Sequence, residues 1–186
     1  MLHRLPEGWA KRFPFLGKIY KKKFDIRVWV LVKSFHPLVF YIYDEGYLRI
    51  SASPYQLDSL SNEKGHLMNF TTNYKKPISA DKSKPNEEDS YVLLNEFVEF
   101  IEAEYGHFGL KHSIHRIIEL TLESVEISQQ SNSFEFYGFD VILDGKLKAW
   151  VLECNLSPAC KERGRLKNVL YKMGKGLLNI MGFIKS

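Results

Sequence analysis

The chain has 186 residues, of which 45% are hydrophobic, so it can form one folded domain with a core and is not an intrinsically disordered chain. Its formal net charge of +4 permits an acidic partner but is too small to indicate nucleic-acid binding by itself. No apolar run approaches the ~20 residues that span a bilayer, and the first residues lack the apolar stretch of a signal peptide. These features predict an intracellular protein that is not inserted in a membrane.

The amino-terminal part of the sequence predicts an irregular segment followed by three strands. Residues 1–22 mix proline and glycine with aromatic residues and end in a basic run. Residues 24–33 place apolar side chains at every second position, which is typical of a strand. Further strands are predicted over 38–43 and 47–51, with a turn at 44–46 between them.

The second half of the sequence predicts helices before and after a β-hairpin. Residues 91–104 and 112–128 place apolar side chains near helical spacing, which predicts two amphipathic helices with solvated acidic faces. Two strands are predicted over 134–143 and 147–155, and a last amphipathic helix over 166–184. This order of elements predicts an α+β fold, an antiparallel sheet with flanking helices.

The hairpin carries the residues with the clearest chemical meaning. Side chains alternate along a strand, and a loop with an even number of residues would place Asp140, Glu153 and Asn155 on one face. The opposite face would then be apolar and able to bury against a core. Its members would be Phe139, Val141, Leu143, Trp150, Leu152 and Cys154.

The length of the hairpin loop decides whether these polar residues meet. A two-residue turn at 144–145 would offset Asp140 from Glu153 by roughly 13 Å. A four-residue loop over 145–148 would place them opposite each other, about 5 Å apart. Two carboxylates and an amide at that spacing suit Mg²⁺, which prefers oxygen ligands. An edge hairpin with a polar, solvated face explains the same pattern without a metal.

The first predicted strand has a charged face opposite its valines. Lys23, Asp25 and Arg27 share this face and could hold phosphates and a ribose hydroxyl, because arginine suits bidentate phosphate contacts and lysine acts as a point charge. A solvated sheet face with cross-strand ion pairs explains them equally well. His66 precedes a polar stretch and could contact a nucleotide or simply lie at the surface.

Several common catalytic motifs are absent from the sequence. It contains no glycine-rich phosphate loop, no Gly-x-Ser-x-Gly and no Cys-x-x-Cys, which argues against the usual nucleotide-triphosphatase, hydrolase and zinc-site interpretations. The only cysteines are Cys154 and Cys160. Since Cys154 falls on the predicted apolar face, we expect a buried thiol rather than a disulfide or a metal ligand.

Five segments together resemble the tubulin–tyrosine ligase family, a branch of the ATP-grasp ligases. They are Lys-Phe-Asp-Ile-Arg-Val-Trp-Val-Leu-Val (23–32), Tyr-Asp-Glu-Gly-Tyr-Leu-Arg (43–49), His-Leu-Met-Asn (66–69), Phe-Glu-Phe-Tyr-Gly-Phe-Asp (134–140) and Trp-Val-Leu-Glu-Cys-Asn-Leu-Ser-Pro-Ala-Cys (150–160). They follow the order of the family and cover most of residues 23–180.

The resemblance implies a fold and a reaction. Residues 23–186 would form the carboxy-terminal portion of an ATP-grasp fold, and residues 1–22 would stay outside it. The family's chemistry uses ATP and Mg²⁺ to activate a carboxylate on the acidic tail of tubulin as an acyl phosphate. The amine of a free amino acid then attacks and forms an amide bond. The implied location is the cytoplasm, on microtubules or in cilia.

The resemblance also implies a role for each matched residue. Residues that would contact ATP are Lys23, Asp25, His66, Leu67 and Asn69. Arg27 would face the γ-phosphate or the acyl intermediate, and Arg49 would lie near the acceptor peptide. Residues that would ligate Mg²⁺ are Asp140, Glu153 and Asn155.

Two questions stay open in the sequence. Asp44 stands where the tyrosine ligase itself has an arginine, which leaves glutamate and glycine beside tyrosine as the added amino acid. The family's amino-terminal domain and the first half of its ATP-grasp fold have no counterpart in the chain. A carboxy-terminal fragment or degenerate paralogue that binds tubulin without catalysis is therefore the alternative to a ligase.

Overall fold

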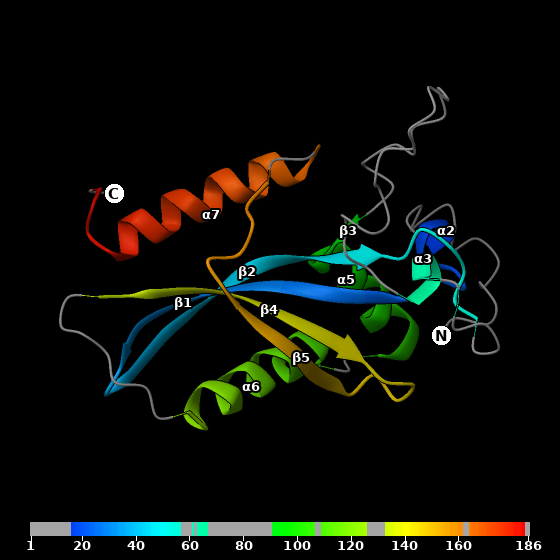
Figure 1. The fold of residues 1–186 in the computed structure, drawn as a ribbon, viewed down its shortest axis with the longest axis horizontal. Helices are drawn as coiled ribbons and strands as arrows, with labels where there is room; N and C mark the ends of the chain where they lie inside the picture. Colours follow the sequence, from blue (N-terminus) through cyan, green and yellow to red (C-terminus); the bar gives the residue numbers. More distant parts are fainter. Residues whose placement is uncertain are drawn as a thin grey trace. The chain divides into compact units, whose positions relative to one another are not determined.

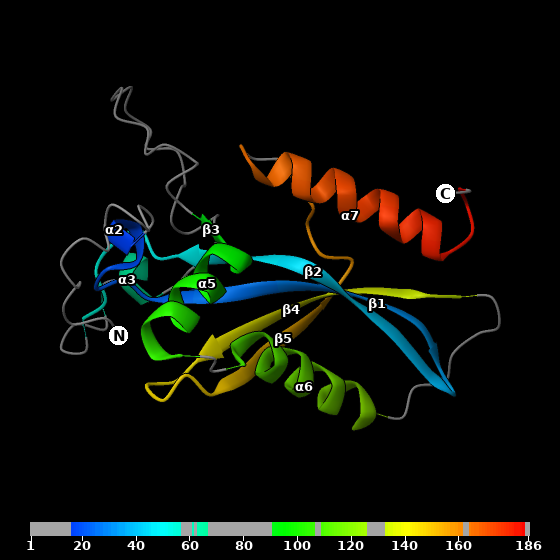
Figure 2. The same ribbon diagram turned by 180° about the vertical axis from the view of Figure 1, so that it is seen from behind.

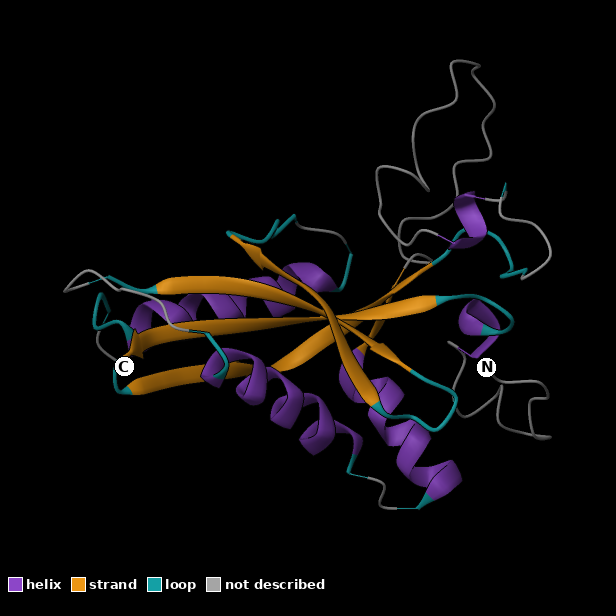
Figure 3. Ribbon diagram, turned by 60° about the horizontal axis from the view of Figure 1, so that its bottom comes forward, coloured by secondary structure: helices purple, strands orange, loops and turns teal. Residues whose placement is uncertain are grey.

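The computed structural model describes residues 16–56, 61, 63–66, 91–106, 109–125, 133–161 and 164–184. They contain a five-stranded sheet with the strand order β3-β2-β1-β4-β5, accompanied by helices (Figure 1). The strands are β1 (Phe24–Phe35), β2 (Leu38–Ile50), β3 (Tyr91–Leu93), β4 (Glu135–Leu143) and β5 (Ala149–Leu156). Antiparallel pairing joins β2 to β3 and β4 to β5. The α+β fold predicted from the sequence is confirmed, as the separate colouring of helices and strands makes plain (Figure 3).

The chain divides into two compact units, and β1 and β2 run through both. Unit 1 comprises Met1–Ile26 and Tyr47–Phe108, and unit 2 comprises Arg27–Gly46 and Gly109–Ser186. Among the residues described, unit 1 contains three helices: α2 (Leu16–Ile19), α3 (Glu63–His66) and α5 (Leu94–Tyr105). Unit 2 contains α6 (Leu110–Glu123) and α7 (Leu166–Ile180).

Aromatic and aliphatic side chains form the core of unit 1. The apolar positions of α5 recur at helical spacing, and five of its side chains are buried. The ring of Phe97 meets that of Phe24 edge-on, with 5.2 Å between centroids. β3 extends the sheet by pairing Leu48 of β2 with Val92, and all these contacts remove apolar surface from water.

In unit 2, α7 and α6 lie on opposite faces of the strands (Figures 1 and 2). Trp29 and Leu31 line a cavity beneath α7 together with Phe136. Because side chains alternate along a strand, Val28 and Val30 point to the other face. Helices on both faces explain why the part of β1 that lies in unit 2 is buried without a break from Arg27 to Val32.

The structure differs from the predicted elements in several places. The turn expected at 44–46 is absent, and β2 continues through it as one strand, because pairing across the sheet overrides the turn tendency of Asp-Glu-Gly. The helix expected from residue 91 begins at Leu94, after the short strand β3. A four-residue helix, α2, lies inside the segment 1–22, which was expected to be irregular.

The β4–β5 hairpin has Asp140 opposite Glu153, one of the two registers that the sequence left open, but it reaches this register by an unexpected route. Leu143 pairs with Ala149, so the loop has five residues, 144–148, and not four. A β-bulge between Asp140 and Val141 then adds one residue on the β5 side, so that Val141 faces Val151 while Asp140 faces Glu153. The loop with an odd number of residues alone would put the polar residues of β4 and β5 on opposite faces. The bulge shifts the pairing by one residue, so that Asp140 and Glu153 share a face.

The same bulge corrects the predicted apolar face of the hairpin. Phe139 and Val141 are fully buried, as expected. Trp150 instead faces Ile142, on the opposite side of the hairpin, and is 47% exposed. Leu152 is the extra residue of the bulge and is exposed as well. The prediction for these two residues was wrong because parity changes at the bulge.

Two glycines offer a matched test of backbone conformation. Gly174, inside α7, and Gly109, before α6, both have free space where a Cβ would be added, but only Gly109 has a left-handed φ of +67°. Gly174→Ala is expected to raise the free energy of unfolding by about 0.5–1 kcal/mol, because alanine loses less backbone entropy in a helix. Gly109→Ala should lower it by about 1–2 kcal/mol. Urea titrations that shift both midpoints in one direction would contradict this account.

No helix among the described residues is both long and apolar enough to cross a membrane.

Candidate functional site

Three polar side chains meet on the β4–β5 hairpin of unit 2. Asp140 lies directly across from Glu153 in the ladder. The Asn155 Nδ2 group donates to Glu153 Oε1 at 3.0 Å and to Asp140 Oδ2 at 3.3 Å. The sequence-based prediction that these residues share one face is therefore confirmed.

This group has the chemistry of a site for a hard cation. The Asn155 amide directs its N–H donors at two carboxylates, which marks a position where positive charge is favoured. Turning the Asn155 amide by 180° exchanges Nδ2 and Oδ1. The Asn155 Oδ1 atom then lies beside the carboxylate oxygens of Asp140 and Glu153, so three side chains present oxygens to the same place. Carboxylate and amide oxygens are ligands that Mg²⁺ accepts, and it keeps water in its remaining positions. The donor set fits the metal that the sequence predicted.

Arg27 completes the charge balance of this group. Its Nε and Nη2 atoms donate to the two carboxylate oxygens of Asp140 at 2.5 and 3.1 Å. The Arg27 side chain is only 8% exposed and that of Asp140 only 1%. Two carboxylates and one guanidinium leave one net negative charge, so the group can still attract a divalent cation. Either buried charge alone would be strongly destabilising.

The chain after β5 turns back against β4 beside Gly138. Ser157 has a left-handed φ of 51°, and its N–H donates to the Phe136 carbonyl at 3.1 Å. Pro158 follows and is buried against Gly138. A Cβ on Gly138 would lie 2.6 Å from the Pro158 Cβ and 3.1 Å from Arg27 Cδ. Glycine at this position therefore allows Pro158 and Arg27 to approach the strand.

Replacing Gly138 with alanine is expected to lower the free energy of unfolding by about 1–3 kcal/mol, because the new methyl group overlaps Pro158 and crowds Arg27. Thermal or urea unfolding of the purified variant measures the loss. Gly145→Ala is the matched control in the same hairpin, since a Cβ at Gly145 meets nothing within 4 Å. Equal stability of the two variants would show that the contact at Gly138 is not tight.

A second ion pair, in which only the carboxylate is fully buried, lies in unit 1. Arg49 donates through Nε and Nη2 to the two carboxylate oxygens of Asp25, at 2.7 and 2.6 Å. The family resemblance implies nucleotide contact for Asp25 and acceptor contact for Arg49, and the structure pairs the two side chains with each other. Bidentate pairing fixes both side chains. The alternative interpretation of the charged strand face was thus right about cross-strand ion pairs but wrong about solvation.

The remaining predicted residues of unit 1 are only partly described. The backbone of Lys23 pairs with Ser51: its N–H donates to Ser51 Oγ at 3.2 Å, and Ser51 N–H donates to its carbonyl at 2.9 Å. The ring of His66 meets that of Tyr55 at 5.1 Å. Leu67 and Asn69 lie outside the described residues.

Sequence reasoning missed four supporting residues. Gly138 carried a usable signal, because a glycine within a strand often marks a close approach of backbone and side chain. Pro158 and Ser51 carried none, since their contacts depend on how the strands pair. Tyr55 likewise gave no hint that it would contact His66.

The cysteines differ from the prediction of a buried thiol. Cys154 and Cys160 are both exposed and not disulfide-bonded. Partial desolvation of the sulfur and the nearby Asp140 carboxylate raise the pKa of the Cys154 thiol to about 11. Cys154 therefore stays protonated at neutral pH and is a poor nucleophile. Among the described residues, no cluster of three or more His, Cys, Asp or Glu side chains could hold a metal.

Comparison with known proteins gives the chain a family. The sequence pattern of the tubulin-tyrosine ligase family matches residues 14–183. Tubulin glycylase 3F of Tetrahymena thermophila is 40% identical over 170 residues, which is 88% of this chain and 18% of that protein. A tubulin polyglutamylase of Mus musculus is 32% identical over 179 residues, 87% of this chain and 13% of that protein. The chain thus spans less than a fifth of these two relatives. Because the family pattern covers nearly the whole chain, the chain belongs to the tubulin-tyrosine ligase family.

Proposed function

We propose that this chain carries part of the active site of an ATP- and Mg²⁺-dependent ligase that adds an amino acid to tubulin. The meeting of Asp140, Glu153 and Asn155 in a member of this family is the observation that carries the proposal. The reaction would convert a tubulin carboxylate and ATP into an acyl phosphate and ADP. The amine of an amino acid would then displace phosphate and form the amide bond.

The proposed roles follow the chemistry of the side chains. Asp140, Glu153 and Asn155 would hold Mg²⁺, which neutralises phosphate charge when it is bound. Arg27 holds Asp140 in place and would also provide positive charge toward the transferred phosphoryl group. The residues proposed to contact ATP are Lys23, Asp25, His66, Leu67 and Asn69. Arg49, fixed by Asp25, would contact the acceptor peptide.

We propose glycine or glutamate as the added amino acid. The relatives described above are named a tubulin glycylase and a tubulin polyglutamylase. Asp44, which stands where the tyrosine ligase has an arginine, forms an ion pair with Lys111 at 2.6 Å. The chain therefore has a negative side chain where the tyrosine ligase has a positive one, which argues against tyrosine as the added amino acid. A location on microtubules follows from the proposed substrate.

Binding of tubulin without ligation is the second candidate. The exposed cationic side chains of α7 favour this candidate, because they can attract an acidic partner and are not among the residues proposed to bind Mg²⁺ or ATP. Incubating tubulin with the chain, ATP, Mg²⁺ and radiolabelled glycine, glutamate or tyrosine separates the candidates. Incorporation of glycine or glutamate supports the proposed ligase, and incorporation of tyrosine alone contradicts the proposed amino acid. Co-sedimentation with microtubules without incorporation favours the second candidate.

A further inference from the structure

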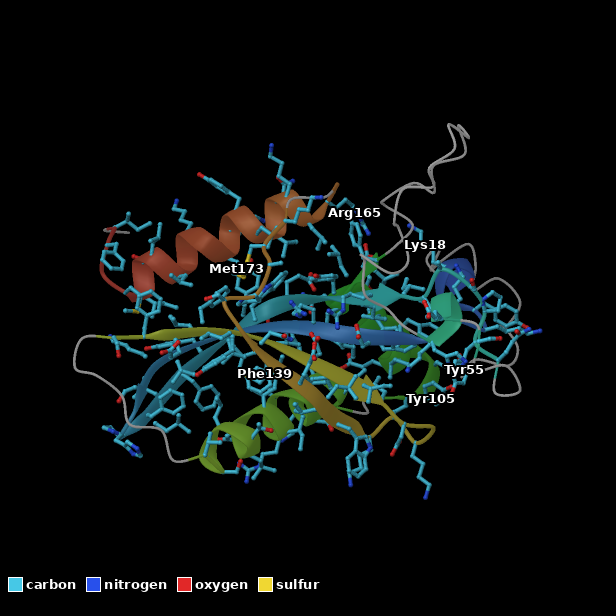
Figure 4. All side chains as sticks on the ribbon, viewed as in Figure 1. Lys18, Tyr55, Tyr105, Phe139, Arg165 and Met173 are labelled. Atoms are coloured by element: carbon cyan, nitrogen blue, oxygen red, sulfur yellow. The ribbon has the colours of Figure 1, made fainter. Side chains whose placement is uncertain are left out.

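A cavity of about 200 Å³ lies within unit 2, where residues of α7 and of the strands β1, β2 and β4 line it. The strands contribute four aromatic side chains, Trp29, Tyr41, Tyr43 and Phe136. On the helix side, Met173 is buried and projects from the side of α7 that faces the strands (Figure 4). All of these walls belong to one compact unit of the chain.

The wall of the cavity is almost entirely uncharged. Among the described residues that line it, Asp44 alone carries a charge, and its side chain is 82% exposed and pairs with Lys111 Nζ at 2.6 Å. The Tyr43 hydroxyl donates to the Val169 carbonyl at 3.4 Å. Because burying a charge without a partner is costly, the cavity suits an uncharged molecule. Water suits it poorly, since a buried water needs about two to four polar partners.

Two features leave this space open to a ligand. Gly176 lines the cavity from α7, and a Cβ added there would meet nothing within 4 Å. A larger side chain at this position could therefore occupy the space. Tyr41 also lines the cavity and is 42% exposed, so the cavity reaches the surface beside this ring.

We propose that this cavity binds a small uncharged aromatic molecule. An apolar cavity of about 150 Å³ holds benzene, so the larger cavity here has room for a substituted ring. Trp29 and Tyr43 already meet edge-on, with 6.3 Å between their centroids, and a bound ring can add edge-on or offset contacts to them. The Met173 thioether is a favourable neighbour of a ring as well. These contacts favour an aromatic ring over a saturated ring of the same size.

This site is separate from the proposed ligation, because it is not lined by the residues proposed to bind Mg²⁺ or ATP. Benzyl alcohol is the probe, titrated into the whole chain with isotope-labelled methionine methyl groups. The NMR signal of the Met173 methyl group, assigned with Met173→Leu, should shift in a saturable way with a dissociation constant on the order of 1 mM. The signal of Met181, which is not among the lining residues, should stay in place.

Two related molecules test the chemistry of the ligand. Cyclohexylmethanol has nearly the same size but no aromatic ring, and it should bind at least about three-fold more weakly in competition with benzyl alcohol. Benzoate keeps the ring but carries a negative charge, and it should bind at least about ten-fold more weakly. Binding of either molecule as tightly as benzyl alcohol would overturn the assignment of an uncharged aromatic ligand.

Gly176→Leu should fill the cavity and weaken binding of benzyl alcohol at least about ten-fold. Gly174→Leu is the matched control, because it makes the same change in the same helix, also with open space at the Cβ, but outside the lining. It should change the dissociation constant less than about two-fold. Gly176→Ala fills less of the space and should weaken binding about two-fold to three-fold, which keeps the test decisive if Gly176→Leu does not fold. A Met173 signal that benzyl alcohol does not shift, or equal affinity of the Gly176 and Gly174 variants, would overturn the inference.

Discussion

Replacing Arg27 with methionine is expected to lower the free energy of unfolding by about 3–5 kcal/mol. Methionine keeps an apolar side chain of similar length, so the change mainly removes the cation. The Asp140 carboxylate, 1% exposed and held by both guanidinium donors, would then be buried without the cation that balances its charge. Urea unfolding followed by circular dichroism measures the loss.

Two comparisons isolate the buried charge as the cause. Arg116→Met breaks the exposed pair with Glu119, in which the side chains are 50% and 38% exposed, and should leave the free energy of unfolding nearly unchanged. The double variant Arg27→Met/Asp140→Asn removes both buried charges and should recover most of the stability lost in Arg27→Met. Losses that simply add in the double variant would show that Arg27 and Asp140 act independently.

Replacing Glu153 with glutamine is expected to reduce amino-acid ligation by about 10²–10³-fold. Glu153 is exposed on the edge strand β5, so the variant should fold as stably as the unmodified chain. Glutamine keeps the size of the side chain and one carbonyl oxygen but removes the negative charge that the proposed Mg²⁺ site needs. A rate assay with tubulin, ATP, Mg²⁺ and the accepted amino acid measures the loss.

The change at Glu153 is more informative than a change at Asp140, because Asp140 also balances the buried Arg27 and its variants would lose stability. Glu104→Gln, at an exposed position on α5, is the matched control and should keep full activity. A Glu153→Gln variant that ligates at the normal rate would show that this carboxylate is not a metal ligand.

The sequence predicted the elements of the fold well wherever the apolar pattern was long and regular. The buried positions of α6, Leu110, Ile114, Ile118 and Leu122, recur at helical spacing, and the helix lies where it was expected apart from its ends. The alternating valines of β1 identified a strand. The turn expected at Asp44 failed because local turn tendency was outweighed by pairing along the whole of β2.

The candidate site shows what parity can and cannot predict. Parity left two registers open for Asp140 and Glu153, and in the structure they lie opposite each other, but Trp150 was assigned to the wrong face because the loop has five residues and a bulge follows it. Neither feature has a signature in the sequence of the hairpin. The ion-pair partners of Arg27 and Arg49 could not be predicted from the sequence either, since these pairs join residues 113 and 24 positions apart. Such pairing is set by the register of the strands.

The most direct measurement is calorimetric titration of ATP into the 186-residue chain, with and without Mg²⁺, beside the Glu153→Gln and Glu104→Gln variants. Our account predicts micromolar binding that requires Mg²⁺, is lost in Glu153→Gln and is kept in Glu104→Gln. ATP binding that is indifferent to Mg²⁺, or that Glu153→Gln leaves unchanged, would contradict a metal site formed by Asp140, Glu153 and Asn155.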